Sequence, residues 1–130
     1  MESTRKAAST RKIIVCDDND DIVTYLVTIL TLENYDVRGV HGYDELMPVL
    51  AKFKPDLLIL DIRMPSMDGF DVLEKLAEKR IKVPVFMVTA HDHFMYRNYA
   101  PVAGVCEYLQ KPIDEDNLLQ KIAALFNPVS

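Results

Sequence analysis

Short apolar runs alternate with amphipathic stretches along most of this chain of 130 residues. The runs are rich in leucine and β-branched side chains, and each ends at polar or turn-forming residues. Such runs are typical of strands that are buried on both faces of a parallel sheet. The pattern predicts five strands, at residues 13–16, 37–40, 57–60, 83–88 and 105–109, of which 37–40 is the weakest and 105–109 has a polar interruption at Glu107.

The stretches between the runs carry apolar residues three and four positions apart, as in helices with one buried face. The four clearest lie at residues 22–33, 42–53, 70–77 and 115–126. Polar side chains just before a helix can cap its free N–H groups. The candidate caps are Asp20 or Asp21 for the first helix, Asp44 for the second and Asp114 for the last. Pro48 would cost the second helix its regularity unless it lies in the first turn.

The stretch between the last two strands, residues 91–103, is the hardest to interpret. It fits a helix, but Pro101 near its end removes a backbone donor. Its aromatic residues are unusual for an exposed helix face; they are Phe94, Tyr96 and Tyr99. If this stretch is helical, strands alternate with helices five times, which predicts an α/β domain with a parallel sheet and helices on both faces.

Composition and charge limit the classes of function that the chain can have. The formal net charge of −5 argues against a general grip on nucleic acid, which needs clustered lysine and arginine. No apolar run approaches the roughly 20 residues of a membrane span, and no secretory signal is evident, so we expect a cytoplasmic protein. Cys16 and Cys106 lie in apolar stretches, where we expect buried free thiols. We interpret residues 1–12 as a flexible arm and residues 13–127 as one domain.

Polar side chains with complementary chemistry stand where the predicted strands end. Asp17 and Asp18 follow the first strand, Asp61 the third, Thr89 the fourth and Lys111 the fifth. Parallel strands bring these ends to one edge of the sheet, where open α/β folds bind ligands. The carboxylates need a counter-charge, and hard oxygen ligands suit Mg²⁺ together with a phosphate group. The set therefore predicts a site for a phosphoryl group on Asp61.

Four short motifs carry a family resemblance. They are Asp17-Asp18, Asp61 with the loop Met64-Pro65-Ser66-Met67-Asp68-Gly69, Thr89-Ala90 and Lys111-Pro112. With the motifs in this order and at these spacings, the chain resembles a response-regulator receiver domain of two-component signalling over residues 12–127. The resemblance implies a flavodoxin-like (βα)5 fold, a three-layer sandwich around a five-stranded parallel sheet of order 2-1-3-4-5.

The resemblance also implies roles for single residues. Asp61 would be the phosphoacceptor, receiving its phosphoryl group from a histidine kinase or a histidine phosphotransfer protein. Mg²⁺ (or Mn²⁺) would be held by Asp17, Asp18, Asp61 and the backbone carbonyl of Arg63. The domain would not be an enzyme in the usual sense, because it would catalyse only its own phosphoryl transfer and dephosphorylation.

A conformational switch is implied as well. Thr89 and Lys111 would contact the phosphoryl group, and Tyr108 would turn inward when Thr89 moves. The resemblance further implies a cis peptide bond before Pro112, a form that X-Pro bonds tolerate.

The neighbourhood of the site departs from the family pattern. Arg63 and His91 flank the site, at places where side chains tune the lifetime of the phosphoryl group in the family. Residues 91–103 fall on a common partner and dimer face, and Pro101 argues against the usual dimer geometry. The three aromatic residues of this stretch predict a partner patch instead.

Two other classes of protein share parts of the pattern. A hydrolase of the haloacid dehalogenase type also uses an aspartate nucleophile and Mg²⁺, but has a second aspartate where this chain has Arg63. A pseudo-receiver would keep the fold but act only as an interaction module. The intact acidic residues, Thr89 and Lys111 argue against this class.

The signal would pass to a downstream protein or to an output domain outside these residues. The chain is therefore either a stand-alone receiver or part of a longer regulator or hybrid kinase.

Overall fold

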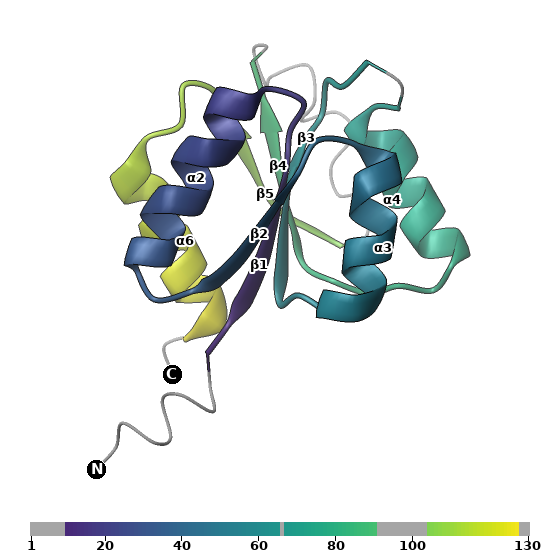
Figure 1. Cartoon of the computed structure of the whole chain (residues 1–130). Helices are drawn as coiled ribbons and strands as arrows, with labels where there is room; N and C mark the ends of the chain where they lie inside the picture. Colours follow the sequence, from purple (N-terminus) through teal and green to yellow (C-terminus); the bar gives the residue numbers. More distant parts are fainter. Residues whose placement is uncertain (1–9, 66, 91–103, 128–130) are drawn as a thin grey trace.

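The computed structural model describes residues 10–65, 67–90 and 104–127 (Figure 1). The predicted arm, residues 1–12, is therefore described only from Thr10 onward. His91 and the aromatic patch predicted within residues 91–103 lie outside the described residues. No helix in the described part has the length and apolar character needed to cross a membrane.

Five parallel strands form the central sheet. In chain order they are β1 (Lys12–Cys16), β2 (Asp36–Val40), β3 (Leu57–Asp61), β4 (Val85–Thr89) and β5 (Val105–Gln110). Their spatial order is β2-β1-β3-β4-β5, which confirms the predicted flavodoxin-like topology. Because all strands are parallel, their carboxyl ends share one edge of the sheet.

Helices cover both faces of the sheet and give the protein three layers (Figure 1). They are α2 (Asp20–Leu32), α3 (Tyr43–Phe53), α4 (Gly69–Glu78) and α6 (Glu115–Phe126). α2 and α6 lie on one face, and α3 and α4 lie on the other. The steps from β1 to β2 and from β2 to β3 run in opposite directions across the sheet. Since such crossovers are right-handed, α2 and α3 fall on opposite faces.

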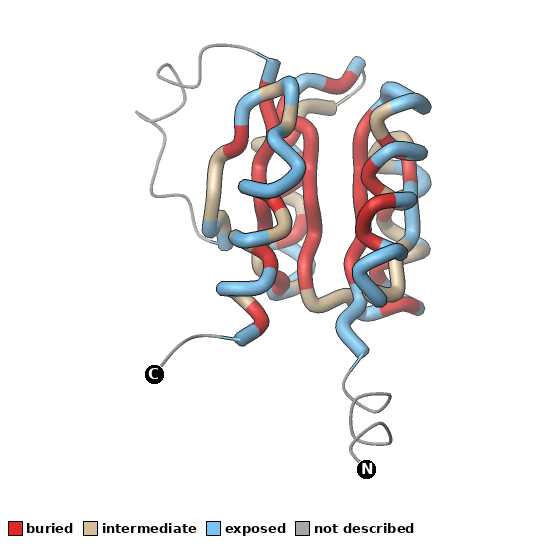
Figure 2. The backbone as a smooth tube through the Cα atoms, turned by 90° about the vertical axis from the view of Figure 1, so that its left-hand side faces the viewer, coloured by how far each residue is buried: buried red, intermediate tan, exposed pale blue. Residues whose placement is uncertain are grey.

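Two hydrophobic clusters fill the space on either side of the sheet. Side chains alternate along each strand, so sequence neighbours enter different clusters. Leu58 and Leu60 of β3 pack with α3 and α4, whereas Leu57 and Ile59 pack with α2 and α6. In Figure 2 the central strands form a buried layer between helices that each keep an exposed side. This burial on both faces explains why β3 is apolar up to its last residue, Asp61.

The start of α2 differs from the prediction. Asn19, and neither Asp20 nor Asp21, is the cap, because its side chain accepts from the N–H groups of Asp21 and Ile22. Asp20 and Asp21 lie in the first turn, where their charges complement the helix dipole. The predicted Asp114 cap of α6 is confirmed.

α3 starts without a side-chain cap. Gly42 precedes its first turn, and the predicted cap Asp44 lies within that turn. The helix continues through Pro48 to its end, and its buried residues Leu46 and Leu50 anchor it on both sides of the proline. Packing against the sheet thus outweighs the local cost of the proline.

β5 forms one edge of the sheet, and its predicted burial is only partly correct. Leu109 is buried, but Cys106 is exposed, so the prediction of two buried thiols is wrong for Cys106 and confirmed for Cys16. An edge strand pairs on one side only, which leaves more of its side chains accessible. β4 begins at Val85, two residues later than predicted, although Val83 is buried as well.

Candidate functional site

The carboxyl ends of β1, β3 and β4 bring three polar side chains into the protein interior. Asp17 follows β1, Asp61 ends β3 and Thr89 ends β4, with exposed fractions of 3%, 3% and 0%. Within the described part of the chain, these are the only buried polar or charged side chains. Burial of a carboxylate is unfavourable unless it is paired, and such groups cluster at functional sites.

Lys111, directly after β5, is the cation that faces the two buried carboxylates. Its Nζ lies 2.9 Å from Asp17 Oδ2 and 3.4 Å from Asp61 Oδ1. The backbone N–H of Lys111 donates to the Thr89 carbonyl over 2.8 Å, so the pairing of β4 with β5 continues to this residue. The peptide bond between Lys111 and Pro112 is cis, as predicted.

Burial and charge shift the protonation of this cluster. Burial, together with the carboxylate of Asp17, raises the pKa of Asp61 to about 6, against the opposing influence of Lys111. Burial also disfavours the charged form of Lys111, but its contacts with Asp17 and Asp61 outweigh that cost and raise the pKa of the ammonium. At neutral pH, Asp61 is therefore mainly a carboxylate and Lys111 an ammonium.

The loop after β3 returns tightly to the end of the strand. The N–H of Gly69 donates to the Ile62 carbonyl over 2.7 Å. A Cβ at Gly69 would lie 2.9 Å from Met87 Cε and 3.0 Å from the backbone oxygen of Asp61. Glycine therefore allows an approach that any side chain would obstruct.

α4 begins with a capping box that the sequence analysis did not anticipate. The N–H of Asp71 donates to Asp68 Oδ1 over 2.9 Å, and the N–H of Asp68 donates to Asp71 Oδ2 over 3.3 Å. The spacing of two acidic residues three positions apart before an apolar stretch was the signal available in the sequence. The last part of the family loop thus starts a helix that fixes where the loop ends.

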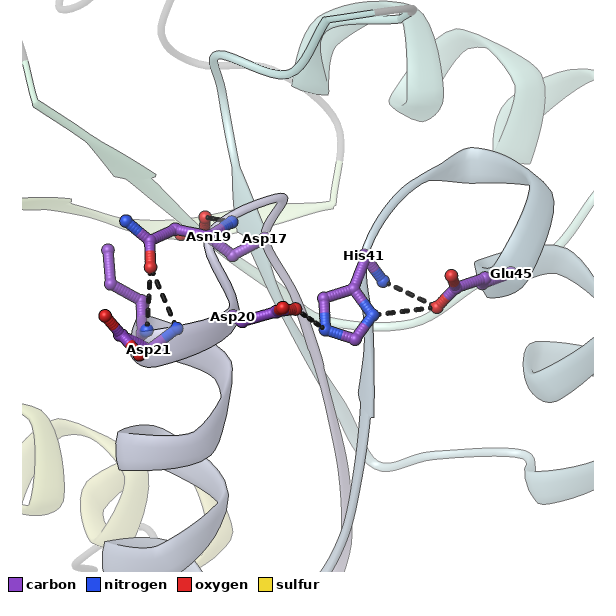
Figure 3. A network of polar contacts seen from close by, with 7 residues as sticks. Asp17, Asn19, Asp20, Asp21, His41 and Glu45 are labelled. Atoms are coloured by element: carbon purple, nitrogen blue, oxygen red, sulfur yellow. Dashed lines mark hydrogen bonds and ion pairs between the residues drawn. The ribbon is translucent and has the colours of Figure 1, made fainter.

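A polar network that the sequence analysis also missed links α2 to α3 beside the acidic residues (Figure 3). The N–H of Asn19 donates to Asp17 Oδ1 over 2.9 Å. The neighbouring Asp20 lies 2.7 Å from His41 Nε2, and His41 Nδ1 lies 3.0 Å from Glu45 Oε1. The separation of His41 and Glu45 by four residues could have suggested their contact, but no local pattern connects His41 with Asp20.

Three carboxylates meet at the carboxyl edge of the sheet. One oxygen from each of Asp17, Asp18 and Asp61 lies within 4.8 Å of the others, with Asp18 exposed and the other two buried. Three carboxylates and one ammonium, that of Lys111, leave two negative charges. Hard oxygen donors with this charge fit a divalent cation of the Mg²⁺ type.

Tyr108 packs against the cluster on the face of α3 and α4. Its hydroxyl is buried and has no hydrogen-bond partner among the described residues. Burial raises the pKa of this hydroxyl. Tyr108 pairs with Met87 of β4, and Thr89 lies two residues further along the same strand. Tyr108 and Thr89 therefore share one face of the sheet.

The structure brings most of the predicted site residues to the same edge. Arg63 is exposed in the loop after β3, and its backbone N–H favours the charged form of Asp61. His91 lies outside the described residues, so its tuning role stays a prediction. The fold and the acidic pocket together define a parallel-sheet domain with a carboxylate, Asp61, at the end of its central strand.

Comparison with known proteins identifies the family. The profile of the response regulator receiver domain matches residues 13–123, and the chain belongs to this family. It is 30% identical over 115 residues to the alkaline phosphatase synthesis transcriptional regulatory protein PhoP of Bacillus subtilis (strain 168), covering 88% of this chain and 48% of PhoP. It is 32% identical over 114 residues to the response regulator MprA of Mycobacterium avium (strain 104), covering 88% of this chain and 50% of MprA. The chain thus spans about half the length of these relatives.

Solved structures give the same family. The receiver domain of the Francisella response regulator 1452 superposes with a TM-score of 0.82 at 25% identity, covering 90% of this chain and 97% of that one. A CheY-like response regulator receiver domain protein from Methanospirillum hungatei JF-1 superposes with a TM-score of 0.81 at 27% identity, covering 91% and 94%. The predicted resemblance to receiver domains is therefore confirmed.

Proposed function

We propose that this chain is the phosphoacceptor switch of a two-component phosphorelay, in which Asp61 receives a phosphoryl group from a phosphohistidine donor. The observation that carries the proposal is the contact of Lys111 Nζ with two buried carboxylates, 2.9 Å from Asp17 and 3.4 Å from Asp61. Membership of the receiver family supports the same assignment. On this proposal the domain is a signalling module that catalyses only its own phosphorylation and dephosphorylation.

Asp61 would act as the nucleophile. One of its carboxylate oxygens attacks the phosphorus atom of the donor phosphohistidine. The new P–O bond forms as the P–N bond breaks, and the electron pair of the broken bond stays on the donor imidazole. Lys111 is close enough to Asp61 to contact an oxygen of the transferred group and to stabilise its charge. Attack of water on the same phosphorus atom later releases phosphate and restores the carboxylate.

The acidic residues would hold Mg²⁺ (or Mn²⁺), with Asp17, Asp18, Asp61 and the backbone carbonyl of Arg63 as protein ligands. When bound, the ion supplies positive charge that balances the carboxylates and the phosphoryl oxygens. Asp17 accepts the N–H of Asn19 and contacts the ammonium of Lys111, so two donors fix the orientation of its carboxylate. This preorganisation supports its role as a ligand.

Phosphorylation would switch the surface of the domain. It replaces the single negative charge of the Asp61 carboxylate with a phosphoryl group that carries close to two, and the phosphoryl oxygens compete with Asp17 for the ammonium of Lys111. Thr89 would move toward the new oxygens. Tyr108 shares a sheet face with Thr89, and its burial would change with that movement. The phosphoryl group shifts this equilibrium only through its different contacts in the two states.

The donor would be a histidine kinase or a histidine phosphotransfer protein, and the signal would pass to a partner or an output domain. PhoP, one of the relatives about twice as long as this chain, is a transcriptional regulatory protein, which supports such an output. We further propose that residues 13–127 act as the receiver, that the residues before β1 form an arm, and that the exchange takes place in the cytoplasm. Arg63 and His91 would tune the lifetime of the phosphoryl group.

Intact-mass measurement after incubation with acetyl phosphate and Mg²⁺ tests this proposal. We expect the wild type to gain one phosphoryl mass, and to gain none in EDTA or as Asp61→Asn. Asp36→Asn, at an aspartate on β2 whose side chain is 41% exposed, is the control and should be labelled like the wild type. Steady turnover of phosphomonoesters would indicate a hydrolase. A wild type that binds no Mg²⁺ and accepts no phosphoryl group, even from a histidine phosphotransfer protein, would indicate an interaction module.

A further inference from the structure

His41 lies directly after β2, at the same edge of the sheet as the acidic site, and bridges two helices (Figure 3). Its Nε2 lies 2.7 Å from Asp20 Oδ1 at the start of α2, and its Nδ1 lies 3.0 Å from Glu45 Oε1 in the first turn of α3. The backbone N–H of His41 donates to the same Glu45 oxygen over 2.9 Å. An imidazolium donates from both ring nitrogens and so satisfies both carboxylates at once.

A short chain of contacts connects this bridge with the acidic site. Asp20 follows Asn19, the cap of α2, and the N–H of Asn19 donates to Asp17 Oδ1 over 2.9 Å. From the other side, the N–H of Asp17 donates to the carbonyl of Val40, the residue before His41, over 3.1 Å. Both ends of the loop between β1 and α2 are therefore held at the end of β2.

Negative charge concentrates around this loop. The described charged groups that contact the His41 ring are Asp20 from α2 and Glu45 from α3. Hydrogen bonds from His41 lower the pKa of Glu45. Burial raises the pKa of Cys16 to about 12, and the charge of Glu45 adds to this shift along with those of Asp17 and Asp61. The charge of Glu45 is therefore felt at Cys16, the residue directly before Asp17.

We propose that His41 is a positioning residue for the acidic site: by holding Asp20 and Glu45 together, it fixes the loop that presents Asp17 and Asp18 to a metal ion. His41 acts through Asp20 and Asn19 and not by contact with the reacting atoms. The part of this inference that concerns the metal ion rests on the proposed function, whereas the part that concerns the order of the loop does not. Because the side chain of Asp20 is 84% exposed, its pairing with His41 is of surface strength and the effect is modest.

Amide hydrogen exchange of the metal-free protein tests the order of the loop. In His41→Gln we expect the N–H of Asn19 to exchange about threefold to fivefold faster, as loss of a surface ion pair predicts, while the amides of β3 exchange as in the wild type. His41→Arg keeps a forked cation and is expected to retain the wild-type rate. Arg38→Gln is the matched control, because it breaks an exposed ion pair of 2.7 Å with Asp36 on the same strand.

Calorimetric titration with Mg²⁺ tests whether this order reaches the site. We expect the Kd for Mg²⁺ to rise about threefold to fivefold in His41→Gln, and to stay near the wild-type value in His41→Arg and Arg38→Gln. Adding Asp20→Asn to His41→Gln should weaken binding little further, because the two residues form one contact.

Each outcome separates the inference from the proposed function. Unchanged exchange and unchanged Mg²⁺ affinity in His41→Gln would overturn the positioning role and leave the proposed function intact. Faster exchange with unchanged affinity would make the His41 bridge purely structural and would overturn the role as well. A wild type that binds no Mg²⁺ would count against the proposed function, while the exchange rates would still decide whether His41 orders the loop.

Discussion

Lys111 Nζ lies closer to Asp17 than to Asp61, at 2.9 Å from Asp17 Oδ2 against 3.4 Å from Asp61 Oδ1. One ammonium therefore serves two buried carboxylates, and the carboxylate at the end of the central strand is the more weakly paired of the two. Burial and the charge of Asp17 keep the pKa of Asp61 raised despite Lys111. The negative charge of Asp61 is therefore only partly compensated by Lys111, which favours the binding of a further cation beside it.

Asp61→Asn is expected to stabilise the metal-free protein at neutral pH. The pKa of Asp61 is raised from 3.8 to about 6 on folding, so the folded state binds its proton more tightly than the unfolded state. The stabilisation that this proton provides is complete below pH 4 and is lost as the pH rises through 6. The loss amounts to about 2 to 3 kcal/mol, which the asparagine variant avoids.

Urea unfolding in EDTA at pH 4, 6 and 7.5 measures this effect. The free energy of unfolding of the variant should be closest to that of the wild type at pH 4, and should exceed it by the largest amount at pH 7.5. Glu74→Gln, on an exposed position of α4, is the control and should show no such divergence. A stability difference that is independent of pH would contradict the assignment of the raised pKa to Asp61.

Lys111→Ala is expected to destabilise the metal-free protein by about 2 kcal/mol at pH 7.5, because two buried carboxylates lose their shared cation. The loss should shrink toward pH 4, where Asp61 carries a proton. Lys75→Ala removes a half-exposed lysine whose Nζ lies 3.8 Å from Glu78 Oε1, and it should cost no more than about 0.5 kcal/mol. Equal losses in the two variants would show that Lys111 contributes no more than a surface cation.

Gly69→Ala is expected to destabilise the protein by about 1 to 3 kcal/mol through overpacking. Its Cβ would lie 3.0 Å from both the Asp61 carbonyl oxygen and Ile62 Cα. Gly42→Ala is the matched control, because Gly42 has an extended backbone and nothing within 4 Å of an added Cβ. Thermal unfolding of both variants makes the comparison, and a neutral Gly69→Ala would mean that the loop can move away from the strand.

The two thiols are expected to react differently in the folded protein. Burial raises the pKa of Cys16 to about 12, whereas Cys106 is exposed. Iodoacetamide at pH 8 should therefore add one adduct to the native protein, located at Cys106, and two adducts in urea. Cys106→Ser should abolish the native adduct. Rapid native labelling of that variant would show that β1 opens to solvent.

Tyr108→Phe is expected to leave the stability unchanged or to raise it by up to about 1 kcal/mol. The hydroxyl of Tyr108 is buried and has no partner within the described part of the structure, so its removal relieves an unfavourable burial. Tyr25→Phe is the control, because the hydroxyl of Tyr25 donates to Glu115 over 3.0 Å and its loss should cost a little stability. Thermal unfolding that shows the larger loss in Tyr108→Phe would reveal a partner for its hydroxyl.

The fold was accessible from local patterns. The alternation of short strand-like runs with amphipathic stretches predicted all five strands. The signal is clearest for a strand buried on both faces, which must be apolar throughout, as Leu57 to Leu60 are. The candidate site was accessible for a related reason, since parallel strands bring their carboxyl ends together wherever the strands lie in sequence. Asp17, Asp61, Thr89 and Lys111 could therefore be grouped before any contact was known.

The details that depend on neighbouring segments were not accessible. Several polar residues are adjacent in sequence before α2. The backbone conformation places the side chain of Asn19, and not that of Asp20 or Asp21, where it accepts from the first N–H groups of the helix. Cys106 has an apolar sequence context, yet its place on an edge strand exposes it. Local sequence patterns show which residues recur on the buried face of a helix or strand. They do not show which side chain from a distant segment will contact a given residue.

The sequence by itself thus determined the order of the elements, the family and the edge of the sheet where the polar residues gather. Only the tertiary structure decided that Lys111 pairs more closely with Asp17 than with Asp61, and that His41 joins Asp20 to Glu45. The physical reason is one of range. Hydrophobic periodicity acts within a few residues, whereas ion pairs and hydrogen bonds of the site join segments that meet only when the sheet has formed.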